Sequence, residues 1–337
     1  MKVMKRRRVV LGVAALCLAA PASGGAPAAP APTPVDIAAK PPGTIRIALL
    51  HMDARPGEVA HNRRLIEHAV EHAAAAQADW LATPELAESG YGFAKRIGLE
   101  WIEAFPSAWL QRLARRARHH RMALFIGLPE KNLAGNMLHN SVAVIDRQGK
   151  ILGTHRKYQV VGGQIERWAT PGVRNAPFVL DGISVGMLVC ADAYRPELAG
   201  RLRALGAQIL ISPANWPPVP GMGPEGYWEA RTAETGVPLI VNNRTGNEPD
   251  LDFRLGESVV AQDGKRLFSF TFPETRLIFL DWDGARGFTA AGDMPLPTQR
   301  PLILVSALGM GGANGYLVLG PAPTRGAIHR RTATRRF

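Results

Sequence analysis

The sequence predicts an α/β domain built around a mixed β-sheet, and two patterns lead to this prediction. Short apolar stretches of strand length alternate with longer stretches in which apolar residues recur at helical spacing. Two further pairs of strand-like stretches are separated only by a short turn that contains glycine, which indicates antiparallel hairpins. Helical crossovers join parallel strands and hairpins join antiparallel ones, so the two patterns together predict a sheet with both kinds of pairing.

The first half of the domain is expected to begin near residue 44. Apolar stretches predict strands over residues 44–52, 79–85 and 122–130. Residues 57–77 and 106–121 show the 3.6-residue period of amphipathic helices, and the second of these helices places a row of arginines on its outer face. Residues 139–157 are typical of a hairpin that turns at residues 147–150.

The second half repeats the alternation. A strand is expected to end at Cys190, followed by a helix over residues 196–205 and a strand over residues 208–215. A helix over residues 227–235, a strand over residues 238–243 and a second hairpin over residues 258–270 complete the predicted order.

The positive charge of the chain is confined to its two ends. The formal net charge is +12, but residues 2–8 and residues 325–336 each carry five Lys or Arg and no acid. The body between these ends is therefore close to neutral and offers no broad phosphate-binding surface. We expect no nucleic-acid partner.

The N-terminus has the layout of a secretory signal peptide. Residues 1–32 combine a basic start, a short apolar stretch and small residues of the kind that precede a cleavage site. Arg7-Arg8 leave both the general secretory and the twin-arginine routes open, and an uncleaved anchor is the alternative. We expect a periplasmic or secreted protein with a Pro/Ala-rich linker over residues 33–43, an ordered domain over residues 44–320 and a basic flexible tail over residues 321–337.

Cleavage of that peptide would leave Cys190 as the one cysteine of the chain. A lone cysteine cannot form an internal disulfide, and a free thiol in an exported protein is either buried and inert or reactive. Composition alone leaves both readings open.

Three titratable residues follow apolar strands: Glu85, Lys157 and Cys190. Strand ends of an α/β sheet hold side chains rigidly beside a crevice. A carboxylate can take the proton of a thiol, a lysine ammonium can stabilise an oxyanion, and the thiolate can attack a carbonyl carbon. Together the three residue types suffice for acyl transfer from an amide, although each alone is more often a cap, a solvated charge or packing. A Cys-His enzyme using His155 or His119 is the alternative.

Three stretches resemble the signature blocks of the nitrilase, or carbon–nitrogen hydrolase, superfamily. In chain order they are "TPELAESGYGF", "HRKYQVVGGQIERWATPG" and "VGMLVCADAYRPEL", and the likeness extends from about residue 44 to about residue 283. The resemblance implies a four-layer αββα sandwich with mixed β-sheets, no metal and no cofactor. Carried over by position, it implies that Glu85 is the general base and acid, that Lys157 holds the tetrahedral intermediate, that Cys190 forms the thioester and that Glu166 is the second glutamate.

The residues after the cysteine, Ala191-Asp192, resemble the amidase and carbamoylase branches more than the nitrile-hydrolysing one. We therefore expect a small amide or carbamoyl substrate, with Tyr91, Asn215 and Trp216 lining its site. Nitrile hydrolysis, acyl transfer to an amine and a catalytically silent ligand-binding member are the alternatives. The resemblance also implies a homodimer or a higher homo-oligomer.

Overall fold

The structure is a computed structural model that describes residues 37–134, 137–161, 165–219 and 226–296, together with two strands at residues 303–306 and 316–319. The described elements form two large sheets and a separate pair of strands. The seven-stranded sheet has the order β13-β12-β1-β2-β3-β4-β5, and the six-stranded sheet has the order β11-β10-β9-β8-β7-β6. Both sheets contain parallel and antiparallel pairs, as the mixture of hairpins and crossovers predicts.

The bounds of the elements follow the predicted order. The first sheet contains β1 (Ile45–His51), β2 (Trp80–Ala82), β3 (Ala123–Lys131), β4 (Leu138–Ile145), β5 (Ile151–Arg156), β12 (Arg276–Asp283) and β13 (Gly287–Pro295). The second sheet contains β6 (Phe178–Leu180), β7 (Ile183–Met187), β8 (Ile209–Pro213), β9 (Leu239–Asn242), β10 (Ser258–Gln262) and β11 (Lys265–Phe270). The helices are α1 (Val59–Ala75), α2 (Phe93–Ile97), α3 (Ala108–His120), η1 (Cys190–Tyr194), α4 (Pro196–Ala204) and α5 (Tyr227–Thr235), and the separate strands are β14 (Ile303–Ser306) and β15 (Tyr316–Leu319).

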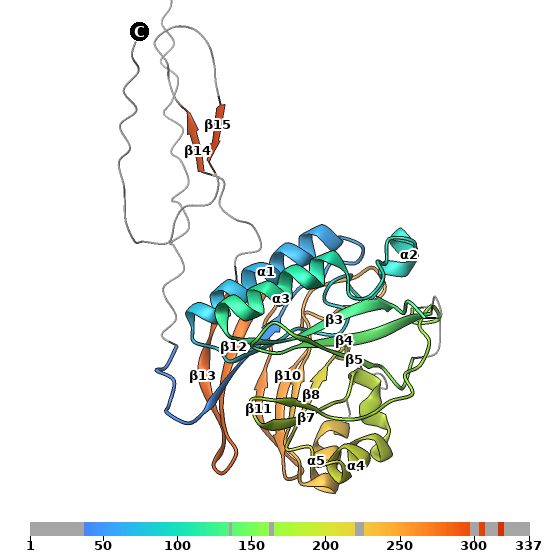
Figure 1. Cartoon of the computed structure of the whole chain (residues 1–337), viewed down its shortest axis with the longest axis vertical. Coiled ribbons are helices and arrows are strands. Elements are labelled where there is room, and N and C mark those ends of the chain that lie inside the picture. Colours follow the sequence, from blue (N-terminus) through green and yellow to red (C-terminus); the bar gives the residue numbers. More distant parts are fainter. Residues whose placement is uncertain are drawn as a thin grey trace, which may run out of the picture. The chain divides into compact units, whose positions relative to one another are not determined.

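The two sheets pack face to face between two pairs of helices, α1 and α3 on one side and α4 and α5 on the other (Figure 1). Strand β1 shows why this arrangement forms. Its residues Ile47 and Leu49 lie in the core between the sheets, whereas Ala48 and Leu50 lie in the core shared with α1 and α3. Side chains of a strand alternate between its faces, so an apolar strand of this kind is stable only when both faces are covered. The predicted αββα sandwich is confirmed.

Three strands of the two large sheets were not among the predicted elements: β6, β12 and β13. Strand β12 lies inside the first sheet, between β1 and β13, and pairs with every residue of β1. Strand β6 has only three residues, and β13 contains two glycines, a proline and an aspartate, which have low strand propensity. Strand β6 is therefore too short to be recognised from its sequence, and β13 is kept extended by its pairing with β12.

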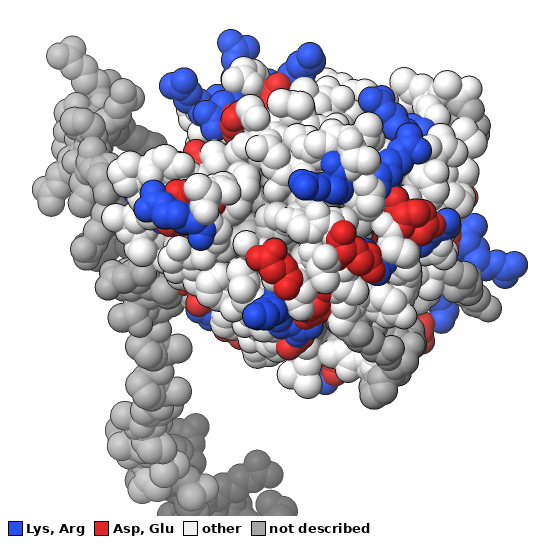
Figure 2. Space-filling view, turned by 90° about the horizontal axis from the view of Figure 1, so that it is seen from below, with Lys and Arg blue, Asp and Glu red and all other residues white. Residues whose placement is uncertain are grey.

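The ends of the chain are described only in part. The predicted signal peptide and the predicted basic tail lie outside the described residues. Residues 37–43, part of the predicted linker, contact the domain: the Ala38 amide donates to the Ala291 carbonyl at 3.0 Å, and Lys40 pairs with Asp79. Among the described helices, none combines the length and the apolar character that a membrane span requires. On the face drawn in Figure 2, basic and acidic side chains are interspersed.

Candidate active site

Residues of both sheets meet at the carboxyl ends of their strands. Glu85 follows β2 and Lys157 follows β5 in the first sheet, while Cys190 follows β7 and Asn215 follows β8 in the second. All four side chains are buried. The fold therefore brings together the three residues that the sequence placed at strand ends.

Glu85 is placed by a close approach of its backbone to β3. The hydroxyl of Thr83 accepts a hydrogen bond from the Gly127 amide at 2.9 Å. A Cβ atom at residue 127 would lie 2.0 Å from the carbonyl oxygen of Pro84, so only glycine permits this approach. Leu86, directly after the glutamate, has a φ of 49°, a conformation that non-glycine residues rarely adopt. The turn that carries Glu85 is thus held in place by its surroundings rather than by its own preference.

The Lys157 ammonium lies between two carboxylates. Its Nζ donates to Oε1 of Glu85 at 2.7 Å and to Oε1 of Glu166 at 2.6 Å. The side-chain amide of Asn140 donates through Nδ2 to Glu85 Oε1 at 2.7 Å, and the same Nδ2 lies 3.4 Å from Glu166 Oε1. The second oxygen of Glu166 accepts from the Val161 amide at 2.7 Å. One lysine and one asparagine therefore fix both glutamates in a buried pocket.

Cys190 lies in a 3-10 turn rather than at the end of a strand, because β7 stops at Met187. Its φ of 48° is again a left-handed value at a non-glycine residue. The Asn215 backbone amide donates to Glu85 Oε2 at 2.9 Å and also acts to lower the pKa of the Cys190 thiol. The turn places Cys190 where Glu85 and Lys157 both act on the charge of its sulfur.

The electrostatics of the cluster favour a neutral thiol at rest. Burial raises the pKa of the Cys190 thiol well above its ordinary value, and the negative charge of Glu85 adds to that effect, while Lys157 opposes it. Burial also disfavours the Lys157 ammonium, but the combined field of Glu85 and Glu166 outweighs it and raises the pKa of Lys157. Burial raises the pKa of Glu166 to about 7, against the opposing effect of Lys157. A nucleophilic thiolate therefore has to form as its proton moves to a neighbouring base, and Glu85 is the adjacent carboxylate.

Asp192 joins the lysine segment to the cysteine turn. Its Oδ1 accepts from the backbone amides of Tyr158 and Gln159 at 2.9 and 2.7 Å. Its Oδ2 accepts from the Val189 amide at 3.0 Å and lies 3.2 Å from His155 Nε2. A single buried carboxylate thus holds the chain on both sides of Lys157 to the turn that presents the thiol. Asp192 belongs to the third signature block, but its role was not predicted from the sequence.

We expect Asp192→Asn to lower kcat by about 10- to 100-fold, as loss of a supporting hydrogen-bond partner does at other buried sites. The amide Nδ2 of asparagine cannot accept the bond from Val189, so the cysteine turn loses its tie to the lysine segment. Steady-state kinetics and thermal unfolding measure the two effects. Asp252→Asn, which removes an exposed carboxylate bound to Arg254, is the control. An Asp192→Asn enzyme with normal kcat would contradict this role.

The three residues assigned to the substrate all lie beside the cluster. The Asn215 side chain donates to the Glu85 carbonyl at 2.8 Å, and the buried Trp216 packs its ring against Tyr194 and Trp228. The charges of Lys157, Glu166, Glu85 and Cys190 all act on the Tyr91 hydroxyl, which places that side chain at the same site. Asn215 therefore orients the glutamate, a role the sequence did not predict.

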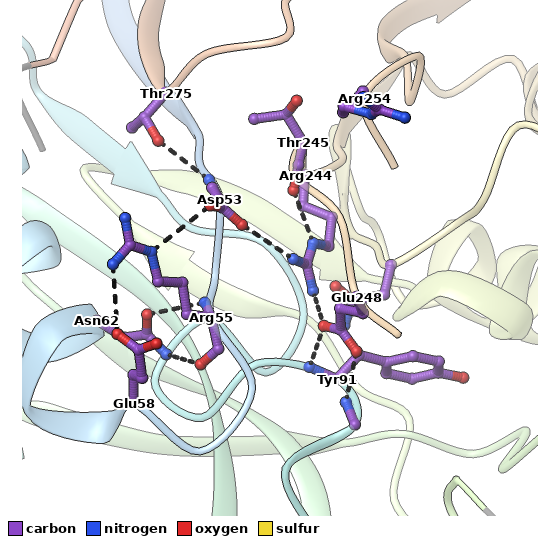
Figure 3. A network of polar contacts seen from close by, with 12 residues as sticks. Asp53, Arg55, Glu58, Asn62, Tyr91, Arg244, Thr245, Glu248, Arg254 and Thr275 are labelled. Atoms are coloured by element: carbon purple, nitrogen blue, oxygen red, sulfur yellow. Dashed lines mark hydrogen bonds and ion pairs between the residues drawn. The ribbon is translucent and has the colours of Figure 1, made fainter. Parts of the chain in front are cut away.

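A buried ion pair holds the Tyr91 loop (Figure 3). Glu248 accepts from the amides of Tyr91 and Gly92 at 3.0 and 2.9 Å and forms an ion pair with Arg244. The Arg244 guanidinium also lies over the ring of Phe253 at 4.5 Å, and that ring meets the Tyr91 ring edge to face. Both the backbone and the ring of Tyr91 are thus fixed by one arginine–glutamate pair.

Glu248→Gln should raise KM several-fold and change kcat less, because it disturbs a loop beside the substrate and leaves the Glu-Lys-Cys cluster intact. Glutamine retains one acceptor oxygen, so one of the two loop amides loses its partner and the buried Arg244 loses its nearest anion. A double-mutant cycle with Tyr91→Ala tests whether Glu248 acts through the tyrosine. Additive effects on KM would show that it does not.

Of the two histidines in the alternative reading, His155 is engaged by Asp192 and His119 lies on a helix surface. His155 is buried and its Nε2 faces Asp192, while His119 lies on the exposed side of α3 with its ring against His120. Asn140, Arg244 and Glu248 were missed by sequence reasoning, since each acts through a partner more than 50 residues away or through a loop of no fixed pattern. Within the described residues, no three His, Cys, Asp or Glu side chains are grouped so as to bind a metal ion.

The fold and the cluster define a hydrolase of the thiol-nucleophile type on an αββα sandwich. The family model for "Carbon-nitrogen hydrolase" matches residues 46–284, and the chain therefore belongs to this family, in the amidase-like branch of the nitrilase superfamily. The names of similar proteins are consistent with this family. It is 35% identical to a protein of Pseudomonas protegens named "Hydrolase in pqqF 5'region", over 66% of this chain and 78% of that one. It is 26% identical to the 2-oxoglutaramate amidase of Bacillus subtilis, over 66% and 85% of the two chains.

A solved amidase has the same fold. The amidase of Nesterenkonia sp. AN1 is 30% identical, with a TM-score of 0.63 over 73% of this chain and 94% of that one, in a form where the acetamide moiety of fluoroacetamide is covalently added at the active-site cysteine. A further form of that amidase is a complex with butyramide, at 29% identity and a TM-score of 0.63 over 72% of this chain and 92% of that one.

Proposed function

We propose that this protein is an exported hydrolase that cleaves the C–N bond of a small amide or carbamoyl compound through a thioester on Cys190. One observation carries the proposal: Lys157 contacts Glu85 at 2.7 Å in a buried pocket where both residues act electrostatically on the Cys190 thiol. A base, an oxyanion-stabilising cation and a nucleophile are thereby preassembled.

In the first half of the reaction, the Glu85 carboxylate takes the thiol proton as the sulfur attacks the carbonyl carbon. The Lys157 ammonium stabilises the oxyanion that forms. Glu85 then returns the proton to the nitrogen, the C–N bond breaks, and ammonia or an amine leaves with the acyl group bound as a thioester to Cys190.

In the second half, Glu85 takes a proton from a water molecule that attacks the thioester carbon. The C–S bond breaks, the sulfur recovers its proton from Glu85, and the carboxylic acid leaves. Glu166 and Asn140 hold the side chains of Lys157 and Glu85 in position during both halves, because Glu166 contacts Lys157 and Asn140 contacts Glu85. The net reaction is amide plus water to acid plus ammonia or amine, and it uses no cofactor.

The comparisons support an amide rather than a nitrile. The similar proteins include the 2-oxoglutaramate amidase and the solved amidase in which an acetamide moiety is attached to the active-site cysteine. Others are named nitrilase and citrullinase, the second of which supports a carbamoyl compound. The Ala191-Asp192 pair after the cysteine favours the amidase and carbamoylase branches of this set.

The test is ammonia release by the purified mature protein from a panel of small amides, ureido acids and nitriles. Cys190→Ala is assayed in parallel. We expect release from amides or ureido acids that is lost in the variant. Release from nitriles alone would replace the proposal with nitrile hydrolysis, and activity only with an added acceptor amine would replace it with acyl transfer. Silence across the panel, with and without amines, would favour a ligand-binding role.

Export and self-association belong to the same proposal. The signal-like residues 1–32 support a periplasmic or secreted location, and the family resemblance supports a homodimer or larger assembly. Fractionation of cells expressing the full chain tests the first, with a chain lacking residues 1–32 as control. Light scattering on the purified protein tests the second, and a monomer mass at micromolar concentration would refute it.

A further inference from the structure

A groove of about 630 Å³ lies next to the two segments that border the active site. One wall comes from the loop and short helix after Tyr91, and the other comes from the segment on either side of Glu166. The loop that contains Glu248 forms the remaining side of the groove. The lining residues used below are Lys95, Arg96, Ile165, Arg167, Trp168 and Leu251.

The position of the groove connects it with the reacting groups. Gly92 and Ile165 line it, and each is the direct neighbour of a residue, Tyr91 or Glu166, that faces the triad. The groove therefore borders the two segments that carry Tyr91 and Glu166 to the candidate active site.

The groove has an excess of positive charge. Its two acids are already paired, because Asp250 lies 3.3 Å from Lys95 and Glu248 binds Arg244. Arg96 and Arg167, by contrast, have no acidic partner among the residues that the structure describes. Ile165, Trp168 and Leu251 add apolar surface between the charges. A ligand that suits such walls has an apolar chain and a negatively charged end.

We propose that this groove binds the far end of the substrate and that this end carries a carboxylate, held by Arg167 and Arg96. The inference rests on the proposed function, which it narrows to amides of carboxylic acids with a second, anionic group. Guanidinium groups bind carboxylates through paired hydrogen bonds, so an arginine is suited to select this group over an apolar one of equal size.

Both arginines are exposed, so their contribution is limited by solvent. Two such contacts should favour an anionic substrate by roughly tenfold in kcat/KM at low ionic strength, and salt should reduce the preference. Substrate contacts made away from the reacting atoms act on binding, so the preference is expected in KM more than in kcat.

The experiment compares monoamides of straight-chain diacids with two to five methylene groups. Each is paired with a neutral amide in which an isopropyl group replaces the carboxylate. Wild type, Arg167→Gln, Arg96→Gln and the double variant are assayed at low and high salt. Arg112→Gln is the matched control, because Arg112 is an exposed arginine that lines a different groove. The protection that each compound gives Cys190 against iodoacetamide provides a second measurement that needs no turnover.

We expect at least one chain length for which the acid is favoured about tenfold over its neutral partner. The double variant should lose most of this preference while retaining its activity on neutral amides, and Arg112→Gln should keep it. A ratio near one at every length, or a preference that survives the double variant, would overturn the inference. Absence of hydrolysis, with protection by the acids that the double variant loses, would refute the proposed function and leave the anion site standing.

Discussion

Cys190→Ala is expected to lower kcat by at least about 10⁴-fold, since removal of the nucleophile from a preassembled catalytic set has effects of this size. No other cysteine is available within the described residues to replace it. The thiol is buried beside Glu85 and Lys157, so the alanine variant loses the attacking atom and keeps its surroundings.

The variant must be shown to be folded for this loss to be informative. The neutral thiol is replaced by a smaller apolar side chain and no charge is removed, so we expect only a small decrease in the unfolding midpoint. Binding of an amide to the inactive variant, measured by calorimetry, is a further control. Residual kcat within tenfold of wild type would show that another residue is the nucleophile.

Lys157→Gln is expected to have the second large effect, and it acts on stability as well as on rate. The lysine is the shared partner of Glu85 and Glu166, all three being buried. Removal of one member of a buried ionic group typically costs about 3–5 kcal/mol of unfolding free energy, because the remaining charges lose their partner. The oxyanion also loses its cation, so kcat should fall by about 10²–10³-fold.

The loss of stability in this variant should depend on pH. In the folded wild type the pKa of Glu166 is about 7, raised by burial from 4.5, so the folded state binds more protons than the unfolded state between these values. Stability therefore declines as pH rises through this window, and the decline should steepen without Lys157.

Urea unfolding of wild type and variant at pH 5 and pH 8 measures this dependence. Lys95→Gln, which removes an exposed lysine from an ion pair with Asp250, is the matched control and should change stability by less than about 1 kcal/mol. Equal loss of stability at both pH values would show that the two carboxylates are not coupled through Lys157.

Much of the fold was predictable from local patterns. The apolar stretch over residues 44–52 reflects a strand buried on both faces, and the helical period over residues 106–121 reflects a helix buried along one stripe. Both patterns can be read without tertiary information. Strands β6 and β13 could not be read in this way. Strand β6 has only three residues, too few to form a recognisable pattern, and β13 is extended because β12 pairs with it although its glycines, aspartate and proline favour turns.

The residues of the candidate site divide in the same manner. The grouping of Glu85, Lys157 and Cys190 was predictable because each of these residues follows an apolar strand and matches a signature block. Asn140 and Glu248 were not, since their roles depend on contacts across 55 and 157 residues of sequence. The displacement of Cys190 from the strand end into a 3-10 turn was also unpredictable, because its left-handed φ is imposed by the surrounding fold.

The most direct test of the central claim is to detect an acyl group on Cys190. The enzyme is mixed with a small amide, quenched in acid within milliseconds to seconds, and analysed by intact-mass and peptide mass spectrometry. Glu85→Gln is tested in parallel because loss of the base for water attack should prolong any thioester that forms. We predict a mass increase equal to the acyl group, located on the peptide that contains Cys190. Turnover without any such adduct, or an adduct on another residue, would contradict the account.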